Sequence, residues 1–154
     1  MRRIELRRHA LRDPDADRLS SDGEILAERV GGMLRGPYAA VFTSPKKRAA
    51  QTAAWFLRGL KHQLPPRHGV AEGLAPPEGK PTDEDAVAAA DAIRRLLAGL
   101  GDGETALAVG HTPILEAAVR ALTGTAIRPL AECEGVVLVE EGEDIRIERE
   151  DRLE

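Results

Sequence analysis

The chain contains little that would tie it to an oxidising compartment or a membrane. Its 154 residues include a single cysteine, Cys133, which excludes an intramolecular disulfide and offers no cluster of metal ligands. No apolar run approaches the length of a membrane span, and the basic residues around Arg7 and His9 interrupt the first apolar segment at once. We therefore expect a cytoplasmic protein without a leader or a membrane partner.

Aromatic residues and strong charge imbalance are also scarce. Aromatics make up 3% of the chain, so the core must be built from leucine, valine, isoleucine and alanine. The net charge is −4, with both signs interspersed, and no basic stripe with interleaved aromatics points to nucleic acid. The length fits one domain, and no repeat or linker divides residues 1–154, so a single domain is expected.

What the sequence does contain is an alternation of short apolar runs and helical patterns. This alternation predicts a three-layer α/β/α sandwich with a mainly parallel, mixed sheet. The expected strands span residues 2–8, 39–43, 68–72 and 105–109, followed by a hairpin of 135–139 and 145–150. The expected helices span residues 21–36, 44–60, 83–100 and 113–123.

Local signals predict where two of these helices begin. Ser21 and Glu24 have the spacing of a capping box before an apolar helical pattern. Ser44 followed by Pro45 is typical of an N-cap and a first helical residue. We therefore expect helices that begin at Ser21 and just after Ser44.

Cationic and imidazole residues directly follow three of the predicted strands. Arg8 and His9 follow the first, Arg48 follows the second by one helical turn, and His111 follows the fourth. The carboxyl ends of parallel strands meet at one edge of a sheet, where ligands bind. Any one of these residues alone is weak evidence, because each could be a solvated or structural side chain. Together they predict a pocket for a dianion such as phosphate.

Three motifs resemble the histidine phosphatase superfamily, the phosphoglycerate-mutase-like group. They are Arg8-His9-Ala10, with alanine where the family usually has glycine, the stretch Thr43 to Thr52, and Gly110-His111-Thr112-Pro113. Their order is that of the family, and the likeness runs from Ile4 to about Val139. Short length, together with the segments 19–23 and 73–76, is similar to the small SixA-type phosphohistidine phosphatases.

The resemblance implies a phosphatase that needs no metal or other cofactor. His9 would be the nucleophile that forms a phosphohistidine intermediate. Arg8, Arg48 and His111 would bind the phosphoryl oxygens, with further contacts from the Ser44 hydroxyl and the Thr112 backbone. The amides of the helix that begins near Pro45 would add positive charge at the same edge.

A proton donor for the leaving group is harder to find in the sequence. Family members that hydrolyse esters usually have a glutamate after the third strand, where Gly73 lies in this chain and Glu72 precedes it. In an extended segment this offset turns the side chain to the opposite face, which makes Glu72 a doubtful acid and leaves Glu78 as a weaker alternative. Phosphohistidine releases imidazole and depends less on such an acid.

The segment between the second and third helices, about residues 61–82, is too short for a cap domain. An uncapped pocket favours a phosphorylated protein side chain, here phosphohistidine, over a small phosphorylated metabolite. Two alternatives stay open: a small-molecule phosphomonoesterase of the same superfamily, and a non-catalytic module that binds phosphate or phosphoproteins.

Overall fold

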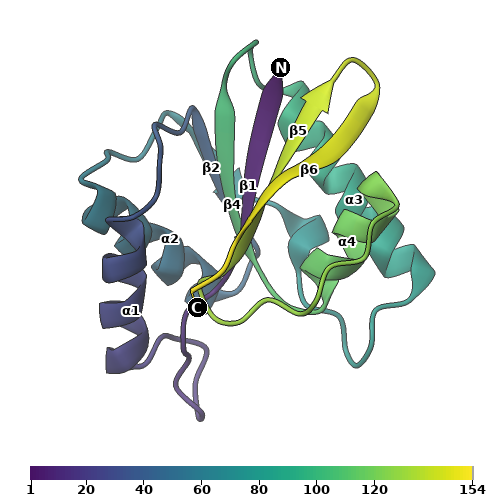
Figure 1. Ribbon diagram of the computed structural model, residues 1–154. Helices are drawn as coiled ribbons and strands as arrows, with labels where there is room; N and C mark the ends of the chain where they lie inside the picture. Colours follow the sequence, from purple (N-terminus) through teal and green to yellow (C-terminus); the bar gives the residue numbers. More distant parts are fainter. Residues whose placement is uncertain (154) are drawn as a thin grey trace.

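The fold is built on one six-stranded sheet. The computed structural model describes residues 1–153 and has the strand order β3-β2-β4-β1-β5-β6 (Figure 1). The strands are β1 (Arg2–Arg8), β2 (Ala40–Thr43), β3 (Arg67–Val70), β4 (Thr105–Gly110), β5 (Gly135–Glu141) and β6 (Asp144–Asp151).

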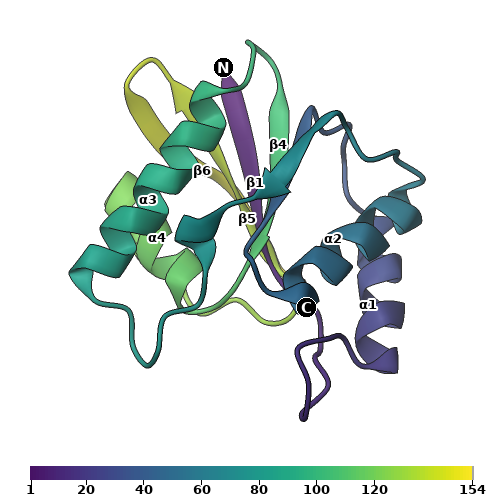
Figure 2. The ribbon, with the colours of Figure 1, turned by 180° about the vertical axis from the view of Figure 1, so that it is seen from behind.

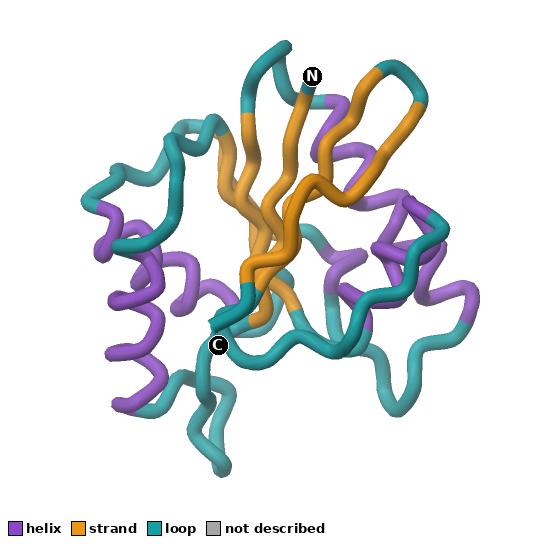
Figure 3. The backbone as a smooth tube through the Cα atoms, viewed as in Figure 1, coloured by secondary structure: helices purple, strands orange, loops and turns teal. Residues whose placement is uncertain are grey.

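Strands β3, β2, β4 and β1 pair in parallel, whereas β5 is antiparallel to β1 and to β6. The carboxyl ends of β1, β2 and β4 therefore lie at one edge, the lower edge in Figure 3, where loops gather. Backbone hydrogen bonds hold this edge together. His9 N–H donates to Gly110 O and Ser44 N–H donates to Val109 O, each with a donor–acceptor distance of 3.0 Å. The predicted meeting point of three strand ends is confirmed.

The helices form two outer layers. Helices α1 (Ser21–Gly31) and α2 (Lys47–Leu60) cover one face of the sheet, and α3 (Asp83–Ala98) and α4 (Ile114–Thr123) cover the other (Figures 1 and 2). A 3₁₀ turn, η1 (Glu72–Leu74), packs against α3. Each face has its own aliphatic core, so the predicted three-layer α/β/α sandwich is confirmed. None of the helices among residues 1–153 has the length and apolar character to cross a membrane.

The predicted start of α1 at Ser21 is confirmed, but its predicted cap and end and the predicted start of α2 are wrong. Helix α1 is capped by Ser20, whose hydroxyl accepts from Gly23 N–H, rather than by Ser21, and the helix ends at Gly31, five residues before the predicted end. Helix α2 begins at Lys47 with Lys46 as its N-cap, so Ser44 is not a cap. Only Ser21 has a glutamate three residues later, but Ser20 forms the cap, and its Oγ also donates to Leu11 O outside the helix.

The region after β3 also differs from the expectation. The third strand ends at Val70, and residues 72–74 form a 3₁₀ turn in place of the extended segment predicted up to Glu72. Alternation of side chains between two faces applies to extended backbone only. Within the 3₁₀ turn, a one-residue offset therefore does not turn Glu72 to the opposite face from position 73.

Helices α1 and α2 cross at very short range through two glycines. A Cβ added to Gly31 would lie 2.3 Å from Phe56 O, and one added to Gly59 would lie 2.0 Å from Glu28 O. Gly31→Ala should therefore destabilise the protein by about 1–3 kcal/mol, because the two helices must separate. Urea unfolding measures the change.

Gly32→Ala is the matched control, since the nearest atom to its added Cβ is 3.5 Å away. This variant should stay within about 0.5 kcal/mol of the wild type. Equal stabilities for the two alanine variants would show that the helices do not depend on this close crossing.

Candidate active site

The four residues singled out in the sequence lie at the carboxyl edge of the sheet. The rings of His9 and His111 are 5.0 Å apart between centroids, at an angle of 58°. Both are buried, with 7% and 2% exposure. Arg48, in the first turn of α2, and Arg8, at the end of β1, are close enough for their charges to act on His9. The structure thus brings together the side chains that the strand ends predict.

The orientation of His9 is set by the turn that follows it. Its Nδ1 lies 2.7 Å from Ala10 O, so we assign the ring proton to this nitrogen, which leaves the lone pair of Nε2 free. Thr52, fully buried, accepts from Ala10 N–H over 3.0 Å and donates to Arg48 O. Ala10 keeps a negative φ, as expected for alanine at this position. The turn therefore presents His9 as a neutral ring with one open nitrogen.

Both arginines donate to protein oxygens through Nη1, and each has an Nε–H, which we call the open donor, without a hydrogen-bond partner in the described part of the chain. Arg8 Nη1 donates to Leu130 O and Arg48 Nη1 donates to Asp17 Oδ1, each over 2.9 Å. In both side chains Nε is buried and has no hydrogen-bond partner among residues 1–153. A buried guanidinium N–H without a partner is costly unless an anion binds it. The open Nε–H donors are suited to phosphoryl oxygens.

Two carboxylates complete the arrangement, and the sequence analysis did not identify either. Asp17 accepts from Arg48 and from the backbone amides of Lys47 and Arg48. Glu132 forms an ion pair with Arg8 over 3.5 Å. Asp17 lies in a run of mixed charges and Glu132 in a loop far along the chain. Neither has a local pattern that would have marked it.

The Asp17 contacts also correct the expectation for the start of α2. The helix begins at Lys47 rather than near Pro45, and its first free amides are already capped by the Asp17 carboxylate. Hydrogen bonds from these amides and from Arg48 keep the pKa of Asp17 below its ordinary value, against the opposing effect of burial. The amides predicted to face a phosphate are therefore occupied by a side chain of the protein.

Ser44 and Thr112 are engaged with neighbouring site residues. Ser44 Oγ lies 2.6 Å from His111 Nε2 and accepts from Lys46 N–H over 3.3 Å. This pair of contacts is satisfied when the hydroxyl donates to Nε2 and the His111 proton is on Nδ1. The Thr112 hydroxyl donates to Glu116 on α4.

The glutamates considered as proton donors lie at the periphery. Glu72 opens the 3₁₀ turn and its side chain is exposed, as is that of Glu78 in the following loop. A Cβ at Gly73 would lie 2.7 Å from Ala92 Cβ and 2.9 Å from Ala88 O. A side chain at position 73 would therefore collide with α3 at its first carbon.

His9 and His111 are neutral near pH 7 because of burial and neighbouring positive charge. Burial lowers the pKa of His9 below its ordinary value of 6.5, and the charges of Arg48 and Arg8 lower it further, while the bond to Ala10 O opposes them. Burial is again the main cause that lowers the pKa of His111 to about 3, with contributions from His9 and Arg48. His111 is therefore an N–H donor rather than a cation near neutral pH.

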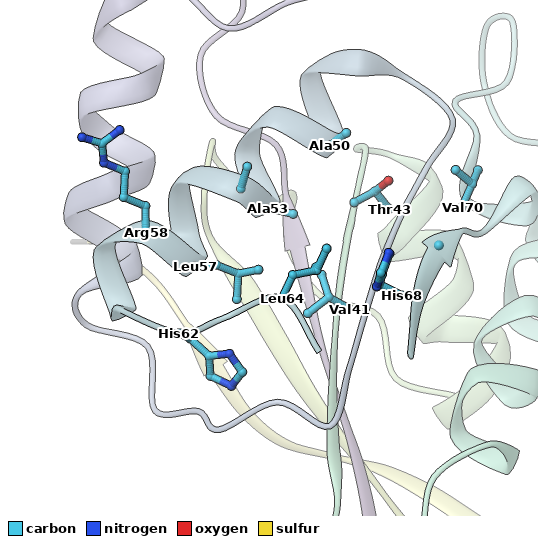
Figure 4. Close-up of a pocket in the computed structure, with 12 residues that line it drawn as sticks. Val41, Thr43, Ala50, Ala53, Leu57, Arg58, His62, Leu64, His68 and Val70 are labelled. Atoms are coloured by element: carbon cyan, nitrogen blue, oxygen red, sulfur yellow. The ribbon is translucent and has the colours of Figure 1, made fainter. Parts of the chain in front are cut away.

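A separate apolar groove of about 490 Å³ lies between α2 and the edge strand β3 (Figure 4). Its lining includes Ala53 and Leu57 of α2, Val41 of the sheet, and the exposed Leu64 and Val70. None of the four site residues lines it. Residues 1–153 contain no group of three or more His, Cys, Asp or Glu side chains placed to hold a metal ion.

The electrostatics predict a specific titration behaviour. Imidazole nitrogen NMR should show the rings of His9 and His111 becoming protonated only below pH 6.5, because the folded pKa values are lowered. Arg48→Gln should raise both midpoints, since the Arg48 charge lowers both. A midpoint at or above 6.5 for either ring in the wild type would contradict this electrostatic account.

The same shifts affect stability. As pH falls below 6.5, the unfolded chain binds protons at these histidines that the folded chain does not bind. Protonation of these two rings therefore favours the unfolded state. The free energy of unfolding falls progressively from pH 6.5 down to the folded pKa of His111, about 3.

Comparison with known proteins agrees with this geometry. Residues 5–96 match the model of the histidine phosphatase superfamily (branch 1). No curated protein matches the sequence. Among solved structures, Bacillus stearothermophilus YhfR is 20% identical with a TM-score of 0.80, and the match covers 100% of this chain and 98% of that one.

Two further structures share the fold. A mutant phosphoserine phosphatase from Entamoeba histolytica, in complex with phosphoserine, is 12% identical with a TM-score of 0.76, covering 98% and 97% of the two chains. The protein histidine phosphatase SixA, complexed with tungstate, is 20% identical with a TM-score of 0.68, covering 97% and 96%. The fold is thus the phosphoglycerate-mutase-like one, and with its family match over more than half of its length, the chain belongs to the histidine phosphatase superfamily.

Proposed function

We propose that the protein is a metal-independent phosphatase that hydrolyses phosphohistidine on proteins through a covalent intermediate on His9. The observation that carries the proposal is the open Nε2 of His9 between two arginines whose buried Nε–H groups have no partner. A nucleophile with a free lone pair and unpaired cationic donors around it suits phosphoryl transfer.

In the first step, the lone pair of His9 Nε2 attacks phosphorus and the bond to the leaving nitrogen breaks. Arg8 and Arg48 bind the equatorial oxygens through their open donors, and neutral His111 donates from Nδ1. The hydroxyl of Ser44 keeps His111 in that tautomer, and the backbone at Thr112 lies at the same edge. Water then attacks the phosphorylated His9, which releases phosphate and restores the neutral ring.

The choice of phosphohistidine follows from the leaving group. An alkoxide needs a proton as it leaves, whereas imidazole leaves with less help. Glu72 and Glu78 are exposed, and position 73 has a glycine packed against α3. The connection between α2 and α3 contains only β3 and η1 and is too short for a cap domain, which favours a phosphorylated side chain on a protein surface.

Phosphate release in EDTA tests the proposal. Wild-type protein should release phosphate from a phosphohistidine protein, and His9→Ala should lose roughly 1000-fold or more, as expected for the loss of a nucleophile. Arg48→Ala, which keeps the nucleophile, should lose roughly 100- to 1000-fold. A coupled enzymatic assay of released phosphate at neutral pH measures all variants with both substrates, the phosphohistidine protein and an aryl phosphate, because acid would cleave the P–N bond of phosphohistidine without an enzyme.

His68→Ala, at an exposed histidine on the edge strand, is the matched control and should keep full activity. Activity that survives in His9→Ala would exclude the covalent route. If the wild type binds the phosphoprotein without releasing phosphate, and His9→Ala binds it equally well, the protein is a binding module.

The second candidate function is hydrolysis of small phosphate esters. It is favoured by Glu132, a carboxylate that lies beside Arg8 and whose charge acts on His9. In that case the wild type should hydrolyse the aryl phosphate faster than phosphohistidine. Glu72→Gln and Glu132→Gln would then identify the proton donor, because only loss of the true donor slows an ester with a poor leaving group by about 100-fold or more.

If phosphohistidine is the substrate, both glutamine variants should keep their rate within a few-fold. A large loss with either variant on the phosphohistidine protein would contradict a leaving group that departs without an acid.

A further inference from the structure

We propose that Glu116 is a positioning residue that fixes the phosphate-binding geometry of Arg8 and His111 from behind the site. The proposal rests on the proposed function in one respect: it takes Arg8 to be a phosphate ligand. Glu116 lies in the first turn of α4, and among residues 1–153 its hydrogen bonds go to Thr112 and Leu130 rather than to His9 or the two arginines. Its contacts reach the site through two other residues.

The first route leads to Arg8. Glu116 Oε2 accepts from Leu130 N–H over 2.9 Å, and Leu130 O accepts from Arg8 Nη1 over the same distance. Leu130 itself is 1% exposed and packs in the core, so it has little freedom to move alone. A shift of this residue would move the carbonyl that orients the Arg8 guanidinium.

The second route leads to His111. The same Oε2 accepts the hydroxyl proton of Thr112, the residue next to His111. His111 O in turn accepts from Leu115 N–H, which joins the end of β4 to the start of α4. One carboxylate oxygen therefore connects the turn that carries His111 to the loop that holds Arg8.

The arrangement costs stability, which argues against a purely structural role. Glu116 Oε1 is buried without a hydrogen-bond partner among residues 1–153. A buried carboxylate oxygen without a partner is unfavourable, and capping α4 alone would not require it. The carboxylate is explained if its other oxygen must hold two site segments at a fixed separation.

Binding of inorganic phosphate to the purified protein, measured by calorimetry, tests the proposal. Glu116→Gln should weaken phosphate binding about 10-fold, because the charged acceptor for Leu130 N–H and Thr112 is lost. Glu116→Asp keeps the charge but shortens the reach, and should also weaken binding. Glu84→Gln, an exposed glutamate in the first turn of α3, is the matched control and should change nothing.

A double-mutant cycle separates positioning from general destabilisation. In an Arg8→Lys background, Glu116→Gln should have a further effect of less than about 5-fold on phosphate binding, because the guanidinium that Leu130 orients is gone and only the route to His111 remains. In an Arg48→Lys background the full effect of about 10-fold should remain. Equal effects in both backgrounds, or unchanged binding in Glu116→Gln, would overturn the proposal.

The outcomes also separate this inference from the proposed function. If the wild-type protein binds no phosphate, the phosphate pocket itself is wrong and the role of Glu116 falls with it. If the wild type binds phosphate and Glu116→Gln binds it equally well, only the positioning role is wrong. Urea unfolding of each variant shows whether a loss of binding reflects a loss of folded protein.

Discussion

The site depends on two guanidinium donors that residues 1–153 of the protein leave without a hydrogen-bond partner. Arg8 and Arg48 each bond a protein oxygen through Nη1, yet both keep a buried Nε without a partner. Their positive charge, together with burial, keeps His9 neutral. An arriving phosphoryl group would satisfy the open donors, and the neutral ring would meet it as a nucleophile. The arginines proposed to bind the phosphoryl group are thus among the groups that keep His9 unprotonated.

The sheet and one loop hold the arginine that carries one of these donors in a fixed position. Arg7 and Arg8 are adjacent on β1 and point to opposite faces, and both bond the loop of residues 130–134, Arg7 through Cys133 O and Arg8 through Leu130 O. Arg7 is itself buried and paired with Glu5 and Asp151 over 2.7 and 2.6 Å. The backbone adds Arg8 N–H to Glu134 O and Cys133 N–H to Arg8 O. A loop distant in sequence is thereby fixed to the strand that ends next to His9.

The sequence predicted the site residues that the strand topology brings together. It did not predict the partners that reach the site only through tertiary contacts. His9, Arg48 and His111 could be grouped because parallel strands end at a common edge, and β1 was predicted residue for residue. The partners Asp17 and Glu132 could not be found, because each reaches an arginine across tens of residues without a local pattern. The start of α2 was misplaced for the same reason: its cap comes from another segment, and the Ser-Pro signal is local.

The start of α2 places positive side chains at the end of the helix where they are unfavourable. Its first turn carries Lys47 and Arg48 and has no acidic residue, although the positive end of a helix dipole disfavours cations by about 0.3–1 kcal/mol each. Asp17, from the loop before α1, supplies the missing anion and binds Arg48 at the same time. A helix selected for stability alone would have its own acidic cap. This one has its cations where a phosphate would be bound and takes its cap from elsewhere, which is the expected sign of a segment selected for anion binding.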